Sequence, residues 1–354
     1  MLSESASYSI MSKTRAKYGH RLTVKDFKDM SALGSVSEIA SFLRTRTHFA
    51  DELSQISESA IHRGNLEKIL KRSNLKEVEQ LCHFEKFTGE KLFQYVMQKL
   101  EIDELLSFMR FLAAGKPEEY IINLSYTVDS YTKIDLISLS KIRSNEDLVK
   151  YLQNTRFSKV ATLLPQNSEE TFDFVLIEVC LDRILNDTSL EMIDESFDVV
   201  VGKELRDILL TRAELYDFML IYRSKLFYSA DEDKIRSEIL GYKRLFTGDI
   251  INEMISAKTA SEVLDIFHHS RYANKISHYD SNTIPDKLCS YILYDFTVKQ
   301  IHFSTHAPVV MISYIFFKEI ELENITNIIE GVRYGLKSDD IYKSLILPAI
   351  KESD

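Results

Sequence analysis

The chain contains few of the residues that interrupt regular structure. Its 354 residues include only 10 glycines and 5 prolines, and it has no tryptophan. Sheet proteins of this size need many tight turns, in which glycine and proline are common. The scarcity of both residues argues against an all-β fold and favours helices. The large side chains of the core are then supplied by 20 phenylalanines and 18 tyrosines.

Cysteines are also few. The three of them, Cys82, Cys180 and Cys289, lie far apart in the sequence, and no CxxC motif is present. An odd number of widely spaced thiols is typical of a protein in a reducing compartment. We therefore expect buried, free thiols.

The sequence lacks a targeting segment and long apolar runs. Its first residues, MLSESASYSI, have neither the basic flank nor the apolar run of a signal peptide. The longest apolar run extends from Val309 to Phe317, whereas a membrane-spanning helix needs about 18 apolar residues or more. We expect a cytoplasmic protein, so any membrane role is peripheral or goes through a partner.

Positive charge is in the minority. The chain has 44 Lys and Arg against 54 Asp and Glu, for a formal net charge of −10. This balance argues against nucleic acid as the main partner, because phosphate binding needs concentrated positive charge. The basic cluster of Lys13, Arg15, Lys17 and Arg21 is most simply a solvated helix face. Its functional alternative is a surface for a protein partner.

Motifs of catalysis and cofactor binding are missing. The sequence has no GxxxxGK[ST], GxSxG or HExxH motif. His302 and His306 are four residues apart and could share a helix face, but two histidines without nearby Cys are a weak start for a metal site. We predict no catalytic residue, no cofactor and no metal ion. The alternative is a helical enzyme whose site has no recognisable motif.

Apolar residues recur at helical spacing along most of the chain. The pattern predicts long helices over residues 92–114, 172–185, 205–226, 286–303 and 308–334. The first of them should stop at Gly115-Lys116-Pro117. No continuous alternating pattern competes with these helices, so we predict an all-α fold.

One short pattern occurs three times. It reads SEIASFLRTRTHF up to Phe49, EDLVKYLQNTRF up to Phe157 and SEVLDIFHHSRY up to Tyr272. The three aromatic residues lie 108 (157 − 49) and 115 (272 − 157) residues apart, close to one third of the chain. Such a period suggests one unit used three times, over about 1–118, 119–235 and 236–354. Chance recurrence of a common helix pattern is the alternative.

Each copy carries the signals of a short, capped helix that ends before an aromatic residue. Acidic residues at the helix start suit the positive end of the helix dipole. The candidate N-caps are Ser37 for the first copy, Ser144 or Asn145 for the second, and Thr259 or Ser261 for the third. The first copy has six residues from Leu43 to Phe49 where the others have five, so its helix end should differ. We predict equivalent places for Phe49, Phe157 and Tyr272.

The last long helix carries a carboxylate on its apolar stripe. That stripe consists of Ile312, Ile315, Leu322, Ile325, Ile329 and Val332. Glu319 lies on it, and a carboxylate in such a place is costly unless it is paired or hydrogen-bonded. We predict that Glu319 is buried and paired with a neighbouring helix, as a structural tie.

Three regions of the sequence resemble one protein family. The segment with Pro308, Tyr314, KEIELENI and Gly335-Leu336 resembles the C-terminal region of the V-type ATPase family that includes the eukaryotic d protein and its C counterparts in other V-type enzymes. The opening SKTRAKYGHRLTVKDFKDM is similar to the start of that family. The threefold pattern is similar to the three tandem copies of the family.

The resemblance implies an all-helical protein of three similar domains, related by pseudo-threefold symmetry and arranged as a funnel or socket. It implies a non-catalytic central-stalk subunit between the D and F shaft subunits and the membrane proteolipid ring. Such a subunit transmits torque for ATP-driven proton or sodium transport, or for ATP synthesis. The alternative is a helical scaffold that binds other protein partners outside a rotary ATPase.

Overall fold

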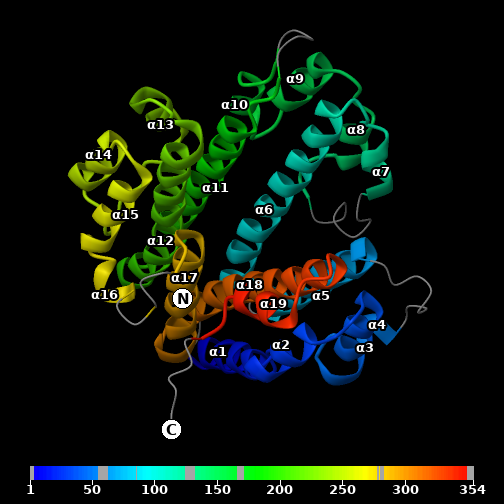
Figure 1. Ribbon diagram of the computed structural model, residues 1–354. Helices are drawn as coiled ribbons and strands as arrows, with labels where there is room; N and C mark the ends of the chain where they lie inside the picture. The colour runs from blue at the N-terminus through cyan, green and yellow to red at the C-terminus, as the bar shows by residue number, and fades with distance from the viewer. Residues whose placement is uncertain are drawn as a thin grey trace. The chain divides into compact units, whose positions relative to one another are not determined.

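In the residues that it describes, the computed structural model contains helices and no strands (Figure 1). These residues are 4–54, 63–84, 86–123, 132–165, 171–276, 279 and 283–348. The all-α prediction is therefore confirmed. The five expected long helices are α6 (Lys86–Ala113), α11 (Phe174–Ser196), α12 (Val199–Arg223), α17 (Pro285–Phe303) and α18 (Ala307–Arg333). The sequence pattern did not single out α5 (Arg63–Phe84), which is also long.

The order of the helices recurs along the described parts of the chain. After α1 (Glu4–Gly19), three short helices precede two long ones, and a further short helix completes the set. The first set is α2 (Val24–Ser31), α3 (Val36–Arg46), α4 (Ala50–Ser54), α5, α6 and α7 (Glu119–Asn123). The second is α8 (Leu136–Ser140), α9 (Asn145–Gln153), α10 (Ser158–Ala161), α11, α12 and α13 (Glu232–Glu238), with a π-helical segment, η2 (Ser224–Tyr228), at the end of α12. The third is α14 (Gly248–Ser256), α15 (Ala260–His269), α16 (Ala273–Ile276), α17, α18 and α19 (Ser338–Ser344).

The three sets are nearly equal in length. Their first helices, α2, α8 and α14, begin 112 residues apart in both intervals (136 − 24 and 248 − 136). Their first long helices, α5, α11 and α17, begin 111 residues apart (174 − 63 and 285 − 174). The period of the short sequence pattern thus extends to the order of the helices. The three-domain division and its funnel arrangement stay predictions.

By its internal contacts the chain divides into two compact units. Unit 1 comprises Met1–Leu92, Lys203–Ile208 and Asn274–Asp354, and unit 2 comprises Phe93–Gly202 and Leu209–Ala273. In unit 1, α18 packs against α1, α2, α3, α5, α17 and α19. In unit 2, α11 packs against α10 and α13, and α14 against α13 and α15. Because α18 has neighbours on so many sides, every residue from Ala307 to Lys318 is buried.

Side-chain caps begin the short helices of the repeated pattern. Ser35, Ser144 and Thr259 each accept a hydrogen bond of 3.2 Å from a backbone N–H three residues ahead. Ser144 and Thr259 were among the predicted caps. The predicted Ser37 is wrong, because α3 begins at Val36 and Ser37 therefore lies inside the helix.

Two further expectations from the sequence concern the cysteines and membrane-spanning helices. As expected, the three cysteines are thiols and not disulfides, with Cys82 and Cys289 buried and Cys180 half-buried. Burial raises the pKa of the Cys82 thiol to about 12, so this side chain stays a thiol at neutral pH. Across the described ranges, no helix has the length and apolar character needed to cross a membrane.

Candidate functional site

Each copy of the short pattern ends in the same local structure. The hydroxyls of Thr47, Thr155 and Ser270 accept hydrogen bonds of 3.2, 3.1 and 3.1 Å from the backbone N–H two residues on. The same hydroxyls donate to a carbonyl in the last turn of the preceding helix. The aromatic residues that follow, Phe49, Phe157 and Tyr272, are at most 1% exposed. The hydroxyl therefore ends the helix and directs the aromatic side chain into the core.

The extra residue of the first copy is accommodated at the helix end. Thr47 donates to the carbonyl of Leu43, four residues back, at 2.6 Å. Thr155 and Ser270 each reach only three residues back. The helix α3 has 11 residues, against 9 in α9 and 10 in α15. The predicted difference in the first helix end is confirmed.

A second shared feature is a buried glutamate on the second long helix of each set. Glu101 on α6, Glu214 on α12 and Glu321 on α18 are at most 2% exposed. Each accepts at least one hydrogen bond from a backbone N–H of the segment just before the first helix of a set. The donors are Lys133 before α8 for Glu101, Arg244, Leu245 and Phe246 before α14 for Glu214, and Leu22 before α2 for Glu321.

These contacts follow one rule, and we call them the glutamate ties. The glutamate of the first set holds the start of the second set, and the glutamate of the second holds the start of the third. The glutamate of the third set holds the start of the first, with Leu22 N donating to Glu321 Oε1 at 2.9 Å. A buried carboxylate is costly unless donors surround it. Each hydrogen bond to a charged group offsets roughly 1.5–3 kcal/mol.

The structure corrects the assignment of the buried carboxylate on α18. Glu319 is half-buried, and the fully buried carboxylate is Glu321, two residues further on. The apolar stripe was a poor guide because α18 is buried on almost every side through Lys318. Glu321 follows Glu214 by 107 residues, and Glu214 follows Glu101 by 113. The near-regular spacing of these glutamates can be found in the sequence. It indicates a shared role only once their hydrogen-bond partners are known.

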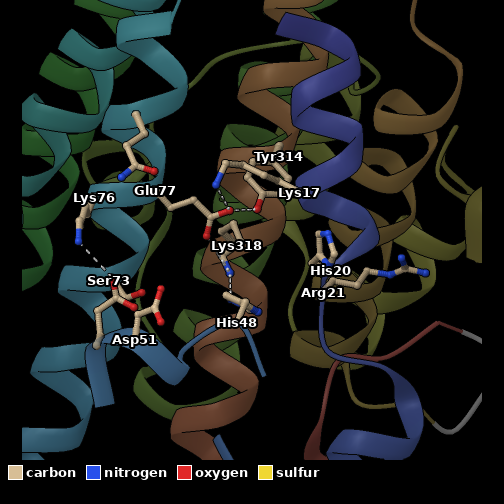
Figure 2. Close-up of a pocket in the computed structure, with 12 residues that line it drawn as sticks. Lys17, His20, Arg21, His48, Asp51, Ser73, Lys76, Glu77, Tyr314 and Lys318 are labelled. Atoms are coloured by element: carbon tan, nitrogen blue, oxygen red, sulfur yellow. Dashed lines mark hydrogen bonds and ion pairs between the residues drawn. The ribbon is translucent and has the colours of Figure 1, made fainter. Parts of the chain in front are cut away.

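A polar cavity of about 260 Å³ lies in unit 1 between α1, α4, α5 and α18 (Figure 2). Its most buried charge is Lys318, which is 3% exposed. The Lys318 ammonium lies 2.5 Å from Glu321 Oε2 and 2.8 Å from His48 Nε2. It also lies 3.8 Å from Glu77 Oε2 and 5.1 Å from the ring centroid of Phe49. Lys318 thus connects a glutamate tie to the first repeated aromatic residue.

Glu77 on α5 gathers donors from two other helices in the same cavity. It accepts a 2.5 Å hydrogen bond from the Tyr314 hydroxyl of α18 and lies 3.3 Å from the Lys17 ammonium of α1 (Figure 2). Burial opposes its ionisation, but Lys318, the Tyr314 hydrogen bond, Lys17 and His48 together lower the pKa of Glu77. Burial, and then Glu77, raise the pKa of Tyr314, which stays a donor. These partners are protein groups on neighbouring helices, so the arrangement ties helices together.

The basic candidates for a partner surface bond within the protein. Arg15 donates to the carbonyls of Ile301 and Ser304 at 2.8 and 2.7 Å, and so caps the C-terminus of α17. Lys17 pairs with Glu77, and the Arg21 guanidinium lies 4.3 Å from the ring centroid of Tyr18. Lys13 also has an interaction partner. A partner surface in this segment stays a prediction.

His302 and His306 do not share a helix face. The helix α17 ends at Phe303, and His306 precedes α18. His306 Nδ1 lies 3.1 Å from Glu204 Oε1, whereas the His302 ring packs edge-on against Tyr18. Among the described residues, no group of three His, Cys, Asp or Glu side chains could hold a metal ion.

Comparison with known proteins places these features in a family context. The family model described as "ATP synthase (C/AC39) subunit" matches residues 10–344 of the chain. The matched range includes all three sets of helices and the three buried glutamates. The search of curated proteins found no match.

Proposed function

The chain belongs to the ATP synthase (C/AC39) subunit family, the C/d family of V-type ATPases, and from this premise we propose that it is a non-catalytic central-stalk subunit. It stands between the D and F shaft subunits and the membrane proteolipid ring and carries torque from one to the other. The observation that carries this proposal is the family match over residues 10–344. Nucleotide chemistry and ion movement belong to other subunits, and the chain is peripheral to the membrane.

The glutamate ties support a mechanical role. A body that transmits torque has to resist sliding of its helices along one another. A carboxylate buried on a long helix and bonded to the backbone of the next set fixes the relative position of both. Glu214 does this with Leu245 and Phe246 at 2.7 and 2.8 Å. The buried charges around Lys318 give α18 a comparable attachment to α5.

We also propose that the three sets of helices are three similar domains. The recurring helix order supports breaks between α7 and α8 and between α13 and α14, a few residues beyond the predicted 118 and 235. The tie from Glu321 to Leu22 joins the last set to the first, as the other two ties join consecutive sets. In this proposal each set is one wall of the socket.

Removal of the chain from its rotary ATPase tests the role. In a strain without the gene, ATP-driven ion transport into membrane vesicles should be lost, because the shaft no longer turns the ring. Adding back the purified chain should restore transport, and the chain alone should hydrolyse no ATP. Undiminished transport without the chain would instead favour a scaffold outside a rotary ATPase. Glu191→Gln, a change on the exposed face of α11, is the matched control and should restore transport like the wild-type chain.

A further inference from the structure

The three glutamate ties differ in the residue that precedes the repeated aromatic. This residue is His48 in the first copy, Arg156 in the second and Arg271 in the third. Arg156 Nε lies 3.5 Å from Glu101 Oε2, so a permanently charged side chain accompanies that tie. His48 Nε2 lies 3.7 Å from Glu321 Oε2, but the charge of a histidine depends on pH.

The long helices differ in a complementary way. The residue three positions before each buried glutamate is Gln98, Thr211 and Lys318, respectively. Of these three residues Lys318 is the cation, and its Nζ lies 2.5 Å from Glu321 Oε2 on the same helix. At the Glu101 tie the permanent positive charge therefore comes from the corner of the short pattern, and at the Glu321 tie it comes from the long helix.

The geometry requires a neutral His48. An ammonium group can only donate hydrogen bonds, so Nε2 of His48, 2.8 Å from Lys318 Nζ, has to accept with its lone pair. A proton on Nε2 would place two positive charges in direct contact. The nearest carboxylate oxygen that could compensate, Glu321 Oε2, already binds Lys318.

Ionisable groups from α1, α4, α5 and α18 surround the cavity that His48 lines. They are Lys318 and Glu321 on α18, Lys76 and Glu77 on α5, Asp51 and Glu52 on α4, and Lys17, His20 and Arg21 on α1 and the turn after it. Burial first, and then Lys318, lower the pKa of His48, while Glu321, Glu77 and the backbone of His20 act in the opposite direction.

We propose that His48 makes this one tie a pH-responsive joint, which opens on acidification while the ties of Glu101 and Glu214 stay closed. The proton binds Nε2 and breaks its hydrogen bond with Lys318. Because His48 directly precedes Phe49, and Lys318 lies over the Phe49 ring, the corner between α3 and α4 moves away from α18. The open form binds the proton more tightly, so the joint weakens as pH falls below the ordinary pKa of histidine, about 6.5.

Hydrogen exchange of the full chain at pH 7.5 and 5.5, corrected for the intrinsic rate, tests the joint. The reporting amides are Leu22 and Phe49 at the Glu321 tie, and the internal controls are Lys133 and Phe157 at the Glu101 tie. We expect protection at Leu22 and Phe49 to fall about tenfold for each pH unit below the onset of protonation. Protection at Lys133 and Phe157 should be unchanged. Equal losses at both ties would overturn the proposal.

Two variants and a titration complete the test. His48→Gln keeps an acceptor for Lys318 without a titrating group, and protection in this variant should not depend on pH. The matched control, His83→Gln on the exposed face of α5, should keep the wild-type dependence. If His48→Gln does not fold, the ring signals of wild-type His48 decide by NMR. Titration below the ordinary range supports the joint, and titration within or above it contradicts it.

Discussion

Glu214 on α12 accepts a hydrogen bond of 2.8 Å from the hydroxyl of Tyr272, the aromatic residue that ends the third copy of the short pattern. Burial, and then Glu214, raise the pKa of Tyr272, which stays protonated as a donor. In the other copies the aromatic is phenylalanine, and its neighbour approaches the glutamate instead: Arg156 at Glu101 and His48 at Glu321. Three different side chains thus serve one repeated connection.

Replacement of Glu214 by glutamine should destabilise the chain. The backbone N–H groups of Leu245 and Phe246 now donate to the carboxylate at 2.7 and 2.8 Å. In the variant they would face the neutral amide group of glutamine. Loss of a charged hydrogen-bond acceptor at a buried site costs about 2–3 kcal/mol, measurable as a lower free energy of unfolding in urea. Glu191→Gln on the exposed face of α11 should change it by less than about 0.5 kcal/mol. If the two variants unfold alike, the tie does not stabilise the fold.

Two glycine-to-alanine changes should have opposite effects. A Cβ at Gly331 of α18 would lie 2.6 Å from Cγ1 of Ile341, so α18 and α19 would have to separate. Overpacking of this kind costs about 1–3 kcal/mol, and Ile341→Ala in the same chain should recover part of it. A Cβ at Gly202 of α12 meets its nearest neighbour, Ile193, at an ordinary 3.5 Å. Gly202→Ala should therefore stabilise the helix by up to about 1 kcal/mol. Thermal unfolding of both variants measures the contrast, and a shared sign would contradict the packing described for α18 and α19.

Ser229→Gly should raise stability. Ser229, with a φ of 46°, ends the π-helical segment η2 (Ser224–Tyr228) that continues α12, and Gly115 and Gly335 follow α6 and α18 with φ of 71° and 67°. A left-handed conformation strains a residue with a Cβ, and glycine should relieve about 0.5–1 kcal/mol of that strain. Ser237→Gly, inside α13, is the control and should lower stability by a similar amount. Chemical denaturation compares the two, and a stability loss at Ser229 would refute the strain argument.

The buried Asp217 should give stability a distinct pH dependence. Burial raises its pKa to about 6, although Leu240 N and Gly241 N donate to it and Arg183 lies nearby. The folded pKa lies above that of an unfolded aspartate, about 3.9. The stabilisation of the folded chain that results from this raised pKa is therefore fully present below pH 4 and is lost as the pH rises through 6. The corresponding residue of the third set, three after its buried glutamate, is Asn324.

Asp217→Asn should consequently gain stability relative to the wild type as the pH rises from 4 to 7. The expected change is on the order of 1.4 kcal/mol for each unit of pKa shift. Urea unfolding of both proteins at pH 4, 5.5 and 7 measures it. A difference that does not vary with pH would show that Asp217 titrates normally in the folded chain.

Local signals in the sequence predicted the helices well, but they did not predict contacts between residues that lie far apart in the sequence. The helix expected over 286–303 is α17 (Pro285–Phe303), because a proline start and apolar spacing are local features. The hydroxyl before each repeated aromatic is local too. By contrast, Glu101 and Glu214 bind backbone amides about 30 residues away, and Glu321 binds one 299 residues away. No side-chain type marks such an amide as a partner. The prediction that Glu319 is the buried carboxylate was wrong for a related reason. An apolar stripe on one face of a helix does not show that the helix is buried on almost every side.

We propose that this chain joins the shaft to the ring, and the most direct test of that role is binding to purified D–F complex from the same organism. Sedimentation analysis at low and high salt measures the association. We expect one stable complex of D, F and this chain, weaker at high salt, because the net charge of −10 contributes to docking. Separate sedimentation of the chain and the D–F complex at both salt concentrations would contradict the central-stalk role.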